Sequence, residues 1–556
     1  MSRERLIYLP LGGAGEIGMN AYVYGYGPEG RERLILVDLG IAFPDMDTTP
    51  GVDVIVPDIA WLAERADRLE AIVITHAHED HVGGIGHLWG QLKAPVHARR
   101  FTANHARRKM RDQGHPEEKV IVAEPWPAQV EAGPFKLGFL PISHSIPESS
   151  ALVIDSPAGR IVHTGDFKID LAPVLGEPFD AEAFRDVSKG GVRALVCDST
   201  NVFSKAEGRS ESTVGPAIRE LVAQASGMVV ATTFASNVAR LKSLAEAGEA
   251  AGRSICLMGR AMRRMTEAAV EEGILTDFPK TVSPEEASDI PRENLMLIVT
   301  GSQGERRAAS AQLSQGKYFG MEMKEGDTFL FSSKTIPGNE KEVARIVNNF
   351  SEMGVDVVSD DDRYHVSGHA NRPDLETMHA LVDAQAVIPM HGEHRHLREH
   401  AKLAESLGRT GVLAPNGTMV DLSGNAPQVI DHVETGRTYL DGSVLVGQFD
   451  GVIRDRIRMA LNGMVVVSIM VEDDDRVLDE PWVELRGLPE TGRSGRALAG
   501  EVEAQIAQRI GRLSRADAAD DDALEAAVKK AAQKVAQDEI GKRPEVTVLI
   551  TRLAPE

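Results

Sequence analysis

Residues 75–81, which read Thr75-His76-Ala77-His78-Glu79-Asp80-His81, decide how this chain of 556 residues is interpreted. Residues 69–74 before them form a short apolar run, which predicts a buried strand with the histidines in the loop at its C-terminal end. The alternative is a polar loop whose histidines only form hydrogen bonds with their neighbours. Imidazoles and carboxylates are ligands for zinc and manganese, and their density favours a site for two adjacent metal ions. The candidate ligands are His76, His78, Asp80 and His81.

Four more polar residues stand at the ends of predicted strands elsewhere in the chain: Asp38, His144, Asp166 and His391. Each is a weak signal by itself, because polar groups at strand ends readily find backbone partners. Together with the first motif, their types and order resemble the metallo-β-lactamase superfamily. That resemblance implies that Asp38 orients the metal loop, that His144 is a ligand and that Asp166 bridges two metal ions.

The last candidate ligand comes very late in the sequence. Residues 167–390 separate Asp166 from His391, which is too long for a loop, so we expect an inserted domain. This layout resembles the β-CASP nucleases, which act on nucleic acids. An acidic residue and two histidines mark the insertion in that group, and they are matched here by Asp198, His369 and His391.

Six shorter segments resemble the bacterial ribonuclease J family, and the resemblance runs through nearly the whole chain. They are residues 12–18 (GGAGEIG), 232–237 (TTFASN), 301–305 (GSQGE), 336–340 (IPGNE), 365–369 (HVSGH) and 542–544 (KRP). The resemblance implies an α/β protein with a metallo-β-lactamase αββα sandwich, an inserted β-CASP α/β domain and a small C-terminal α/β domain.

The domain boundaries are expected where the sequence pattern changes. The metallo-β-lactamase domain is expected over residues 1–203 and 365–432, the insert over 204–364, a linker over 433–452 and the C-terminal domain over 453–556. Apolar runs predict strands at residues 228–231, 295–299, 464–469 and 546–550, and helices are predicted over residues 237–248 and 523–537.

The resemblance implies a ribonuclease that hydrolyses RNA phosphodiesters with two metal ions, acting in RNA maturation and decay, including rRNA processing and mRNA decay. It implies 5′-to-3′ exonuclease activity that prefers a 5′-monophosphate, together with endonuclease activity. One divalent ion would take His76, His78 and His144, the other Asp80, His81 and His391, with Asp166 shared. Zinc is the expected metal and manganese or magnesium the alternative, because imidazole and carboxylate ligands accept more than one of them.

Three residues receive catalytic roles from the resemblance. Asp80 would orient the attacking water as well as bind metal. His369 would form a hydrogen bond with the phosphoryl oxygens or assist the leaving 3′ oxygen, the alternative being a histidine that only orients a ligand. Asp198 would form a hydrogen bond with a ligand histidine.

Two short segments are expected to contact single-stranded RNA, because small residues with many hydrogen-bond donors can close around a phosphate. The alternative is a pair of tight turns between domains. The expected substrate-binding residues are Ala235, Ser236 and Asn237 on one side and His365, Val366, Ser367, Gly368 and His369 on the other.

The charge balance limits how RNA is bound. Lysine and arginine number 61 against 83 acidic residues, and a net charge of −22 excludes a protein that coats nucleic acid through bulk electrostatics. RNA binding is therefore expected to be local. Arginines and a lysine between Arg99 and Arg111 form one candidate patch, and Arg240 lies in another, although both patterns also fit ordinary surface helices.

Cysteine usage and hydropathy predict a cytoplasmic protein. Cys197 and Cys256 offer no disulfide framework, and Cys197 lies in an apolar run that predicts a buried strand. The first residues lack the apolar core of a signal peptide, and no apolar run approaches a membrane span, so no membrane contact is expected. The resemblance implies a homodimer or homotetramer assembled through the C-terminal domain.

Two other function classes fit part of the sequence. A small-molecule hydrolase such as a lactonase would share the metal motifs but needs neither the long insert nor His369. A non-catalytic partner that binds RNA or a degradation complex would share the fold but has no need of seven intact metal ligands.

Overall fold

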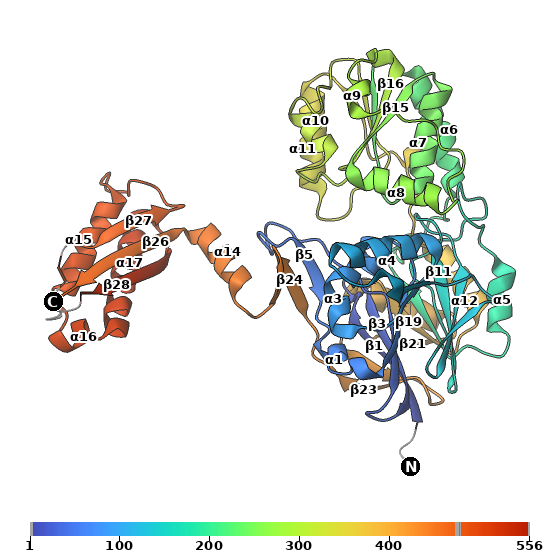
Figure 1. Ribbon diagram of the computed structural model, residues 1–556, viewed down its shortest axis with the longest axis horizontal. Coiled ribbons are helices and arrows are strands. Elements are labelled where there is room, and N and C mark those ends of the chain that lie inside the picture. The colour runs from blue at the N-terminus through green and yellow to red at the C-terminus, as the bar shows by residue number, and fades with distance from the viewer. Residues whose placement is uncertain (1–3, 473–476, 479, 554–556) are drawn as a thin grey trace. The chain divides into compact units, whose positions relative to one another are not determined.

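The computed structural model describes residues 4–472, 477–478 and 480–553 (Figure 1). The chain forms two compact units, one made by residues 1–42 and 56–437 and the other by residues 43–55 and 438–556. Among the described residues, no helix combines the length and the apolar character that a membrane span needs.

Two mixed sheets form the centre of the first unit. The first has the strand order β23 (Gln428–His432), β22 (Thr418–Asp421), β1 (Glu4–Gly12), β3 (Ala21–Pro28), β4 (Arg33–Val37), β6 (Leu69–Ile74), β7 (Val96–Ala98), β8 (Val120–Val122). The second has the order β21 (Thr410–Gly411), β19 (Ala386–Met390), β13 (Ala194–Asp198), β12 (Gly159–His163), β11 (Ser150–Ser156), β10 (Phe135–Pro141), β9 (Gln129–Ala132). A two-residue pairing joins β2 (Ala14–Gly15) to β20 (Gly392–Glu393). The predicted strand over residues 69–74 is therefore confirmed.

The two sheets face each other across one apolar core. Tyr8, Tyr24 and Val73 from the first sheet pack with Leu152 and Val196 from the second, and all five are fully buried. Burial of this kind is the main stabilising term of such a sandwich, at about 25 cal/mol for each Å² of apolar surface.

Helices cover the outer faces of both sheets. On the second sheet, Phe184, Leu375 and Leu403 pack against Val162 and Leu195. They belong to α5 (Ala181–Ser188), α12 (Arg372–Val382) and α13 (His394–Ser406). On the other side, α4 (Arg100–Asp112) contacts β7 and β8 and packs with α3 (Ile85–Leu92), and the short helices α1 (Ala60–Ala63) and α2 (Glu79–Val82) complete the layer. The predicted αββα sandwich is confirmed.

The insert is a separate α/β layer built on a five-stranded parallel sheet. Its strand order is β15 (Ser254–Met258), β16 (Leu295–Val299), β14 (Val229–Thr232), β17 (Thr328–Phe331), β18 (Asp356–Val358). Its helices are α6 (Val214–Gln224), α7 (Val238–Ala250), α8 (Arg260–Glu271), α9 (Pro284–Ala287), α10 (Ala309–Gln315) and α11 (Glu340–Glu352). These bounds confirm the strands predicted at residues 228–231 and 295–299 and the helix predicted over 237–248.

An apolar cluster joins the insert to the sandwich beside the metal loop. Ala77 and Phe101 of the sandwich pack with Val238 and Ala268 of the insert. Asn104 donates hydrogen bonds to the carboxylates of Glu271 and Glu272 at the edge of this cluster. Because Ala77 stands between two of the candidate ligands, the insert is packed directly against the loop that carries them.

Two small sheets are built largely from residues of the second unit. The first has the order β25 (Val444–Gly447), β24 (Arg437–Asp441), β5 (Val54–Pro57), and the second has the order β27 (Trp482–Arg486), β26 (Met464–Val471), β28 (Glu545–Arg552). The helices are α14 (Val452–Asn462), α15 (Leu498–Ile510), α16 (Arg515–Ala519) and α17 (Asp521–Ile540). Val502 and Val528 from α15 and α17 pack with Val467 on one face of the second sheet. The predicted C-terminal α/β domain, its two strands and its alanine-rich helix are confirmed.

Candidate metal centre

The loop after β6 is held in place by Asp38, which follows β4. The carboxylate of Asp38 accepts hydrogen bonds from the backbone and the hydroxyl of Thr75 at 2.8–3.1 Å and from Nδ1 of His81 at 2.7 Å. Asp38 is fully buried and has a φ of 61°, so the chain turns sharply at this point. The predicted role of Asp38 in orienting the loop is therefore confirmed.

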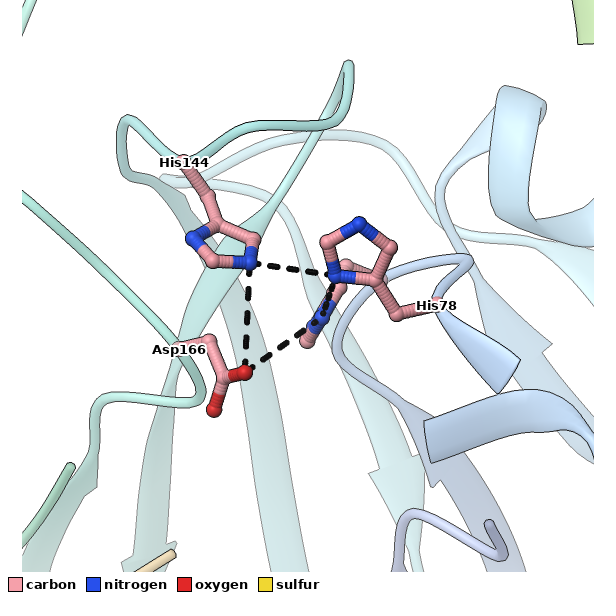
Figure 2. Close-up of side chains that lie close together, drawn as sticks. His78, His144 and Asp166 are labelled. Carbon is pink, nitrogen blue, oxygen red and sulfur yellow. Dashed lines mark hydrogen bonds and ion pairs between the residues drawn. The ribbon is translucent and has the colours of Figure 1, made fainter. Parts of the chain in front are cut away.

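Three imidazoles meet beside the loop. Nδ1 of His78 lies 3.1 Å from Nε2 of His76 and 3.1 Å from Nε2 of His144, which comes from the segment between β10 and β11. Asp166, which follows β12, places Oδ2 3.9 Å from both Nε2 atoms. Figure 2 shows the rings of His78 and His144 turned toward one another above the carboxylate of Asp166.

A second group of side chains lies near the same carboxylate oxygen. Oδ2 of Asp166 is 3.2 Å from Nε2 of His81 and 3.6 Å from Nε2 of His391, which follows β19. Oδ2 of Asp80 is 3.1 Å from Nε2 of His391 and 3.7 Å from Nε2 of His81. Asp166 therefore belongs to both ligand groups, and the structure brings together all seven residues predicted as metal ligands.

The outer nitrogen atoms of these rings show which nitrogen is free to bind a metal. Nδ1 of His144 donates to the carbonyl of Gly368 at 2.6 Å, and Nδ1 of His81 donates to Asp38, so Nε2 carries the lone pair in both rings when they are neutral. The hydroxyl of Thr200 donates to Asp198 at 2.7 Å and can accept the Nδ1 proton of His391 at 2.8 Å. When neutral, each of these three rings can thus present a lone pair to the centre, which is how metal-binding histidines are usually oriented.

Burial controls the protonation of the first group. It lowers the pKa of His76 and His144 well below the ordinary value and lowers the pKa of His78 to about 4, so these rings are neutral at neutral pH. Burial also acts to lower the pKa of His81 and His391, but the neighbouring carboxylates, Asp166 first among them, raise both overall.

The residues fit divalent metal ions. Nε2 of His76 and Nε2 of His144 both lie 3.1 Å from Nδ1 of His78, which can carry only one proton, and Oδ1 of Asp166 is buried without a hydrogen-bond partner among the described residues. A cation among the rings would satisfy the nitrogen lone pairs and the carboxylate. Histidine and carboxylate ligands suit zinc and manganese alike.

His369 stands next to the two ligand groups and is held by Asp198. Its Nδ1 donates to Oδ2 of Asp198 at 2.8 Å. The side chain of His369 is 24% exposed whereas that of Asp198 is 1% exposed, so the histidine alone reaches solvent. Burial acts to lower the pKa of His369, but Asp198 and the carboxylates behind it raise it to about 9. The imidazole can therefore carry a positive charge and donate a hydrogen bond to an anionic substrate.

The segment that carries His369 is fixed by hydrogen bonds to both sides. Ser367 accepts from the amide of Asn201 at 2.8 Å and from the backbone N–H of His369 at 3.1 Å. The carbonyl of Gly368 holds His144, as described above. Val366 packs into the apolar core of the insert, and burial lowers the pKa of His365 to about 3. Within residues 365–369, it is therefore Ser367, Gly368 and His369 that form hydrogen bonds next to the candidate metal centre.

The facing loop of the insert precedes α7. The hydroxyl of Ser236 lies 3.1 Å from Nε2 of His78, so the insert touches a candidate ligand directly. The side chain of Asn237 is buried and accepts from the backbone N–H of Arg240, which makes it the N-cap of α7. Ala235 lines a cavity of about 270 Å³ together with Arg260 and Ser302.

Sequence reasoning missed two residues that position ligands. Thr200 joins Asp198 to His391, and Asn20 places Nδ2 3.0 Å from Nε2 of His81 while donating to the carbonyl of Asp80. The position of Thr200 two residues after Asp198 was a usable signal, because hydroxyls near carboxylates at strand ends often form such bonds. Asn20 gave no local signal, since its partners lie about 60 residues away in the sequence.

The structure argues against Arg240 as part of an RNA path. Its guanidinium is fully buried, pairs with the carboxylate of Glu211 at 2.6 Å and donates to the carbonyls of Ser332 and Tyr364. Residues of the basic patch around α4 also form ion pairs, some partly buried and some at the exposed surface. Arg99 pairs with two glutamates, and Lys109 pairs with Glu79.

Replacing Arg240 by methionine is expected to destabilise the first unit by about 3–5 kcal/mol, because it leaves Glu211 buried without its partner. Urea unfolding followed by circular dichroism measures the change. Arg185→Met is the matched control, since the pair of Arg185 with Glu182 is 54% and 80% exposed and contributes less than about 1 kcal/mol. A stability equal to that of the control would contradict a structural role for Arg240.

Comparisons with known proteins identify the family. Four protein-family models match consecutive parts of the chain: "Metallo-beta-lactamase superfamily" (residues 15–196), "Ribonuclease J, beta-CASP domain" (226–350), "Zn-dependent metallo-hydrolase RNA specificity domain" (354–415) and "Ribonuclease J C-terminal domain" (451–553). The Ribonuclease J of Sinorhizobium meliloti is 41% identical over 99% of this chain and 98% of its own length. The chain belongs to the ribonuclease J family. The resemblance found in the sequence is therefore confirmed.

More distant relatives agree with this assignment. The Ribonuclease J of Corynebacterium glutamicum is 35% identical over 88% of this chain and 68% of its own length, and that of Thermus thermophilus is 32% identical over 90% and 87%. A solved protein of unknown function from Enterococcus faecalis V583 has a similar fold, with a TM-score of 0.52 and 16% identity over 75% of this chain and 100% of that one.

Proposed function

We propose that this protein degrades single-stranded RNA by two-metal hydrolysis, as a 5′-to-3′ exonuclease that prefers a 5′-monophosphate and also cleaves internally. Its family and its metallo-β-lactamase and β-CASP domains make it a metal-dependent hydrolytic ribonuclease. The observation that carries the two-metal scheme is the position of Asp166, whose Oδ2 lies within 3.9 Å of histidines from both ligand groups. We place this activity in rRNA processing and mRNA decay.

Two divalent ions are proposed, zinc first and manganese or magnesium as alternatives. His76, His78 and His144 would hold one, Asp80, His81 and His391 the other, and Asp166 would contact both. Bound ions would neutralise charge on the phosphoryl oxygens and lower the pKa of the attacking water. The remaining chemistry belongs to the side chains around them.

His369 is the residue proposed to act on the substrate directly. Asp198 fixes its ring through Nδ1, so Nε2 is the nitrogen that can donate to a phosphoryl oxygen or to the leaving 3′ oxygen. Ser236, Ser367 and Gly368 stand nearby as proposed substrate contacts, since their small side chains and backbone leave room for a terminal phosphate. Ala235, Asn237, His365 and Val366 complete the proposed RNA-contacting segments.

The proposal is tested by a time course on RNA that carries either a 5′-monophosphate or a 5′-triphosphate, with the terminal nucleotide labelled. We expect immediate release of labelled mononucleotide from the monophosphate substrate, slower release from the triphosphate, and none with His76→Ala. His369→Ala should lower turnover by about 10²–10³-fold, as the loss of one active-site donor does elsewhere. His432→Ala, a change at an exposed residue of β23, should leave it unchanged.

Other outcomes separate the alternatives. Cleavage of circular RNA, which has no 5′ end, reports the endonuclease activity alone. Internal fragments without mononucleotide release would reject the exonuclease part of the proposal. If the metal-loaded protein cleaved neither the linear nor the circular RNA, a small-molecule hydrolase or a non-catalytic scaffold would be favoured. Equal rates on RNA and on a DNA strand of the same sequence would contradict a preference for RNA.

We also propose a homodimer or homotetramer that assembles through the open face of the sheet β27-β26-β28. Trp482 on β27 and Leu549 on β28 are the two cross-strand partners of Ser468 on β26, so they lie on the same face of the sheet. Trp482, Leu549 and Met470 are each about half exposed. Contiguous exposed apolar residues of this size commonly mark a protein contact. Trp482→Glu is expected to reduce the mass measured by light scattering to that of one chain. Ile121→Glu, an exposed residue on β8, should not, and a monomeric parent protein would reject the proposal.

A further inference from the structure

A second group of potential metal ligands is buried outside the centre described above. Cys197 on β13, His379 on α12 and His400 on α13 each offer one ligand atom, and these three atoms lie within 4.8 Å of one another. All three residues are at most 1% exposed. No carboxylate belongs to this group, so its chemistry differs from that of the catalytic ligands.

The hydrogen bonds of the group leave it incompletely satisfied. Nε2 of His379 lies 2.9 Å from Nε2 of His400, and the two rings are stacked with their centroids 5.1 Å apart. Nδ1 of His400 lies 2.9 Å from the hydroxyl of Ser199. Nδ1 of His379 is buried without a hydrogen-bond partner among the described residues. A buried, unpartnered polar atom of this kind calls for an explanation.

We propose that Cys197, His379 and His400 form a buried structural site for a thiophilic metal ion, with zinc as the first candidate. Two imidazoles and one thiolate are ligands that zinc accepts at about 2.0–2.3 Å. Nε2 of His379 and Nε2 of His400 are 2.9 Å apart and share one hydrogen-bonding proton. An ion bound to these two nitrogen atoms and to Sγ of Cys197 would take the place of that proton.

The protons balance in a simple way. In the metal-free state one of the two Nε2 atoms carries the proton of the mutual hydrogen bond. On binding, that proton moves to Nδ1 of the same ring, and the Sγ proton of Cys197 is released to solvent. The product holds two neutral imidazoles and one thiolate, and binding releases one proton for each ion.

The position of the group suggests what the ion would do. Asp198 is the last residue of β13, α12 begins three residues after His369, and α13 begins three residues after His391. An ion bound to Cys197, His379 and His400 would therefore cross-link the three elements next to these active-site residues. The ion would fix the positions of β13, α12 and α13 relative to one another from the outer layer of the sandwich, and it would not contact the substrate.

Cobalt substitution tests the site independently of RNA cleavage. The catalytic ligands are all nitrogen or oxygen atoms, so a thiolate-to-cobalt charge-transfer band in the near ultraviolet can come only from a cysteine. The chain has two cysteines, and Cys256→Ser leaves Cys197 as the single one. We expect metal-stripped Cys256→Ser protein, reloaded with Co²⁺, to show the band, and His400→Gln in the same background to lose it.

The same proteins give a second readout. After equilibration with zinc, the Cys197→Ser chain should retain about one ion per chain less than the Cys256→Ser chain. His76→Ala should keep the cobalt band, which separates this site from the proposed catalytic one. Absence of the band in the Cys256→Ser protein, or its survival in the His400→Gln variant, would overturn the proposal whatever the ribonuclease assays show.

Discussion

Replacing Asp166 by asparagine is expected to abolish RNA hydrolysis, with a loss larger than about 10³-fold, the upper end for removal of one active-site donor. The substitution keeps the shape of the side chain but removes the negative charge that lies within 3.9 Å of five histidines. Both ligand groups lose their shared oxygen anion, so the metal content measured by plasma mass spectrometry should fall together with the rate.

Asp155→Asn is the matched control for this prediction. Asp155 lies on β11 in the same sheet but pairs with Arg160 near the surface, away from the histidines. Its substitution should change neither the rate nor the metal content. An Asp166→Asn protein that kept both within tenfold of the parent would contradict the proposal that this carboxylate is shared by two ions.

Replacing Gly368 by alanine should lower the rate of RNA hydrolysis by about 10²-fold, the cost of misplacing a catalytic group by about 1 Å. A β-carbon at this position would lie 2.6 Å from Oγ of Ser145 and 2.8 Å from Cε1 of His144. The ring of His144 or the carbonyl that holds it must shift. Steady-state rates and zinc affinity together measure the effect, since displacement of a ligand weakens metal binding as well as turnover.

The control for Gly368 is another glycine with free space around it. Gly500 lies in α15, has an ordinary φ, and a β-carbon there would meet nothing within 4 Å. Gly500→Ala should leave the rate unchanged and stabilise the helix by up to about 1 kcal/mol. If Gly368→Ala behaved in the same way, the close approach to His144 would have no functional meaning.

Much of the candidate centre could be predicted because its signal is local. His76, His78, Asp80 and His81 are neighbours in the sequence, and the apolar strand before them fixes where the loop stands. His144, Asp166 and His391 were found only through the order typical of a family, since a single histidine after a strand carries little information. The length between Asp166 and His391 was enough to predict the insert.

The remaining features depend on contacts between distant residues. Arg240 looks like part of a basic helix face, and only the fold shows the carboxylate of Glu211 and the carbonyls of Ser332 and Tyr364 around its guanidinium. Residues 43–55 belong to the second unit because the backbone N–H of Asp53 donates to the carbonyl of Leu440, a pairing without any local pattern. Cys197, His379 and His400 are likewise far apart in the sequence. Each of them, taken alone, has the sequence pattern of an ordinary buried residue, so their proximity could not be predicted.

The position of His391 in the chain has a consequence for synthesis. His76, His78, His144 and Asp166 precede the insert, whereas His391 and the carbonyl of Gly368 that holds His144 follow it. A ribosome that has made the first ligand group must still translate the whole insert before the second group can close. Under the proposed two-metal scheme, the nascent protein therefore cannot cleave its own messenger RNA until the codon for His391 has been read, and a product truncated within the insert would be harmless to the transcript.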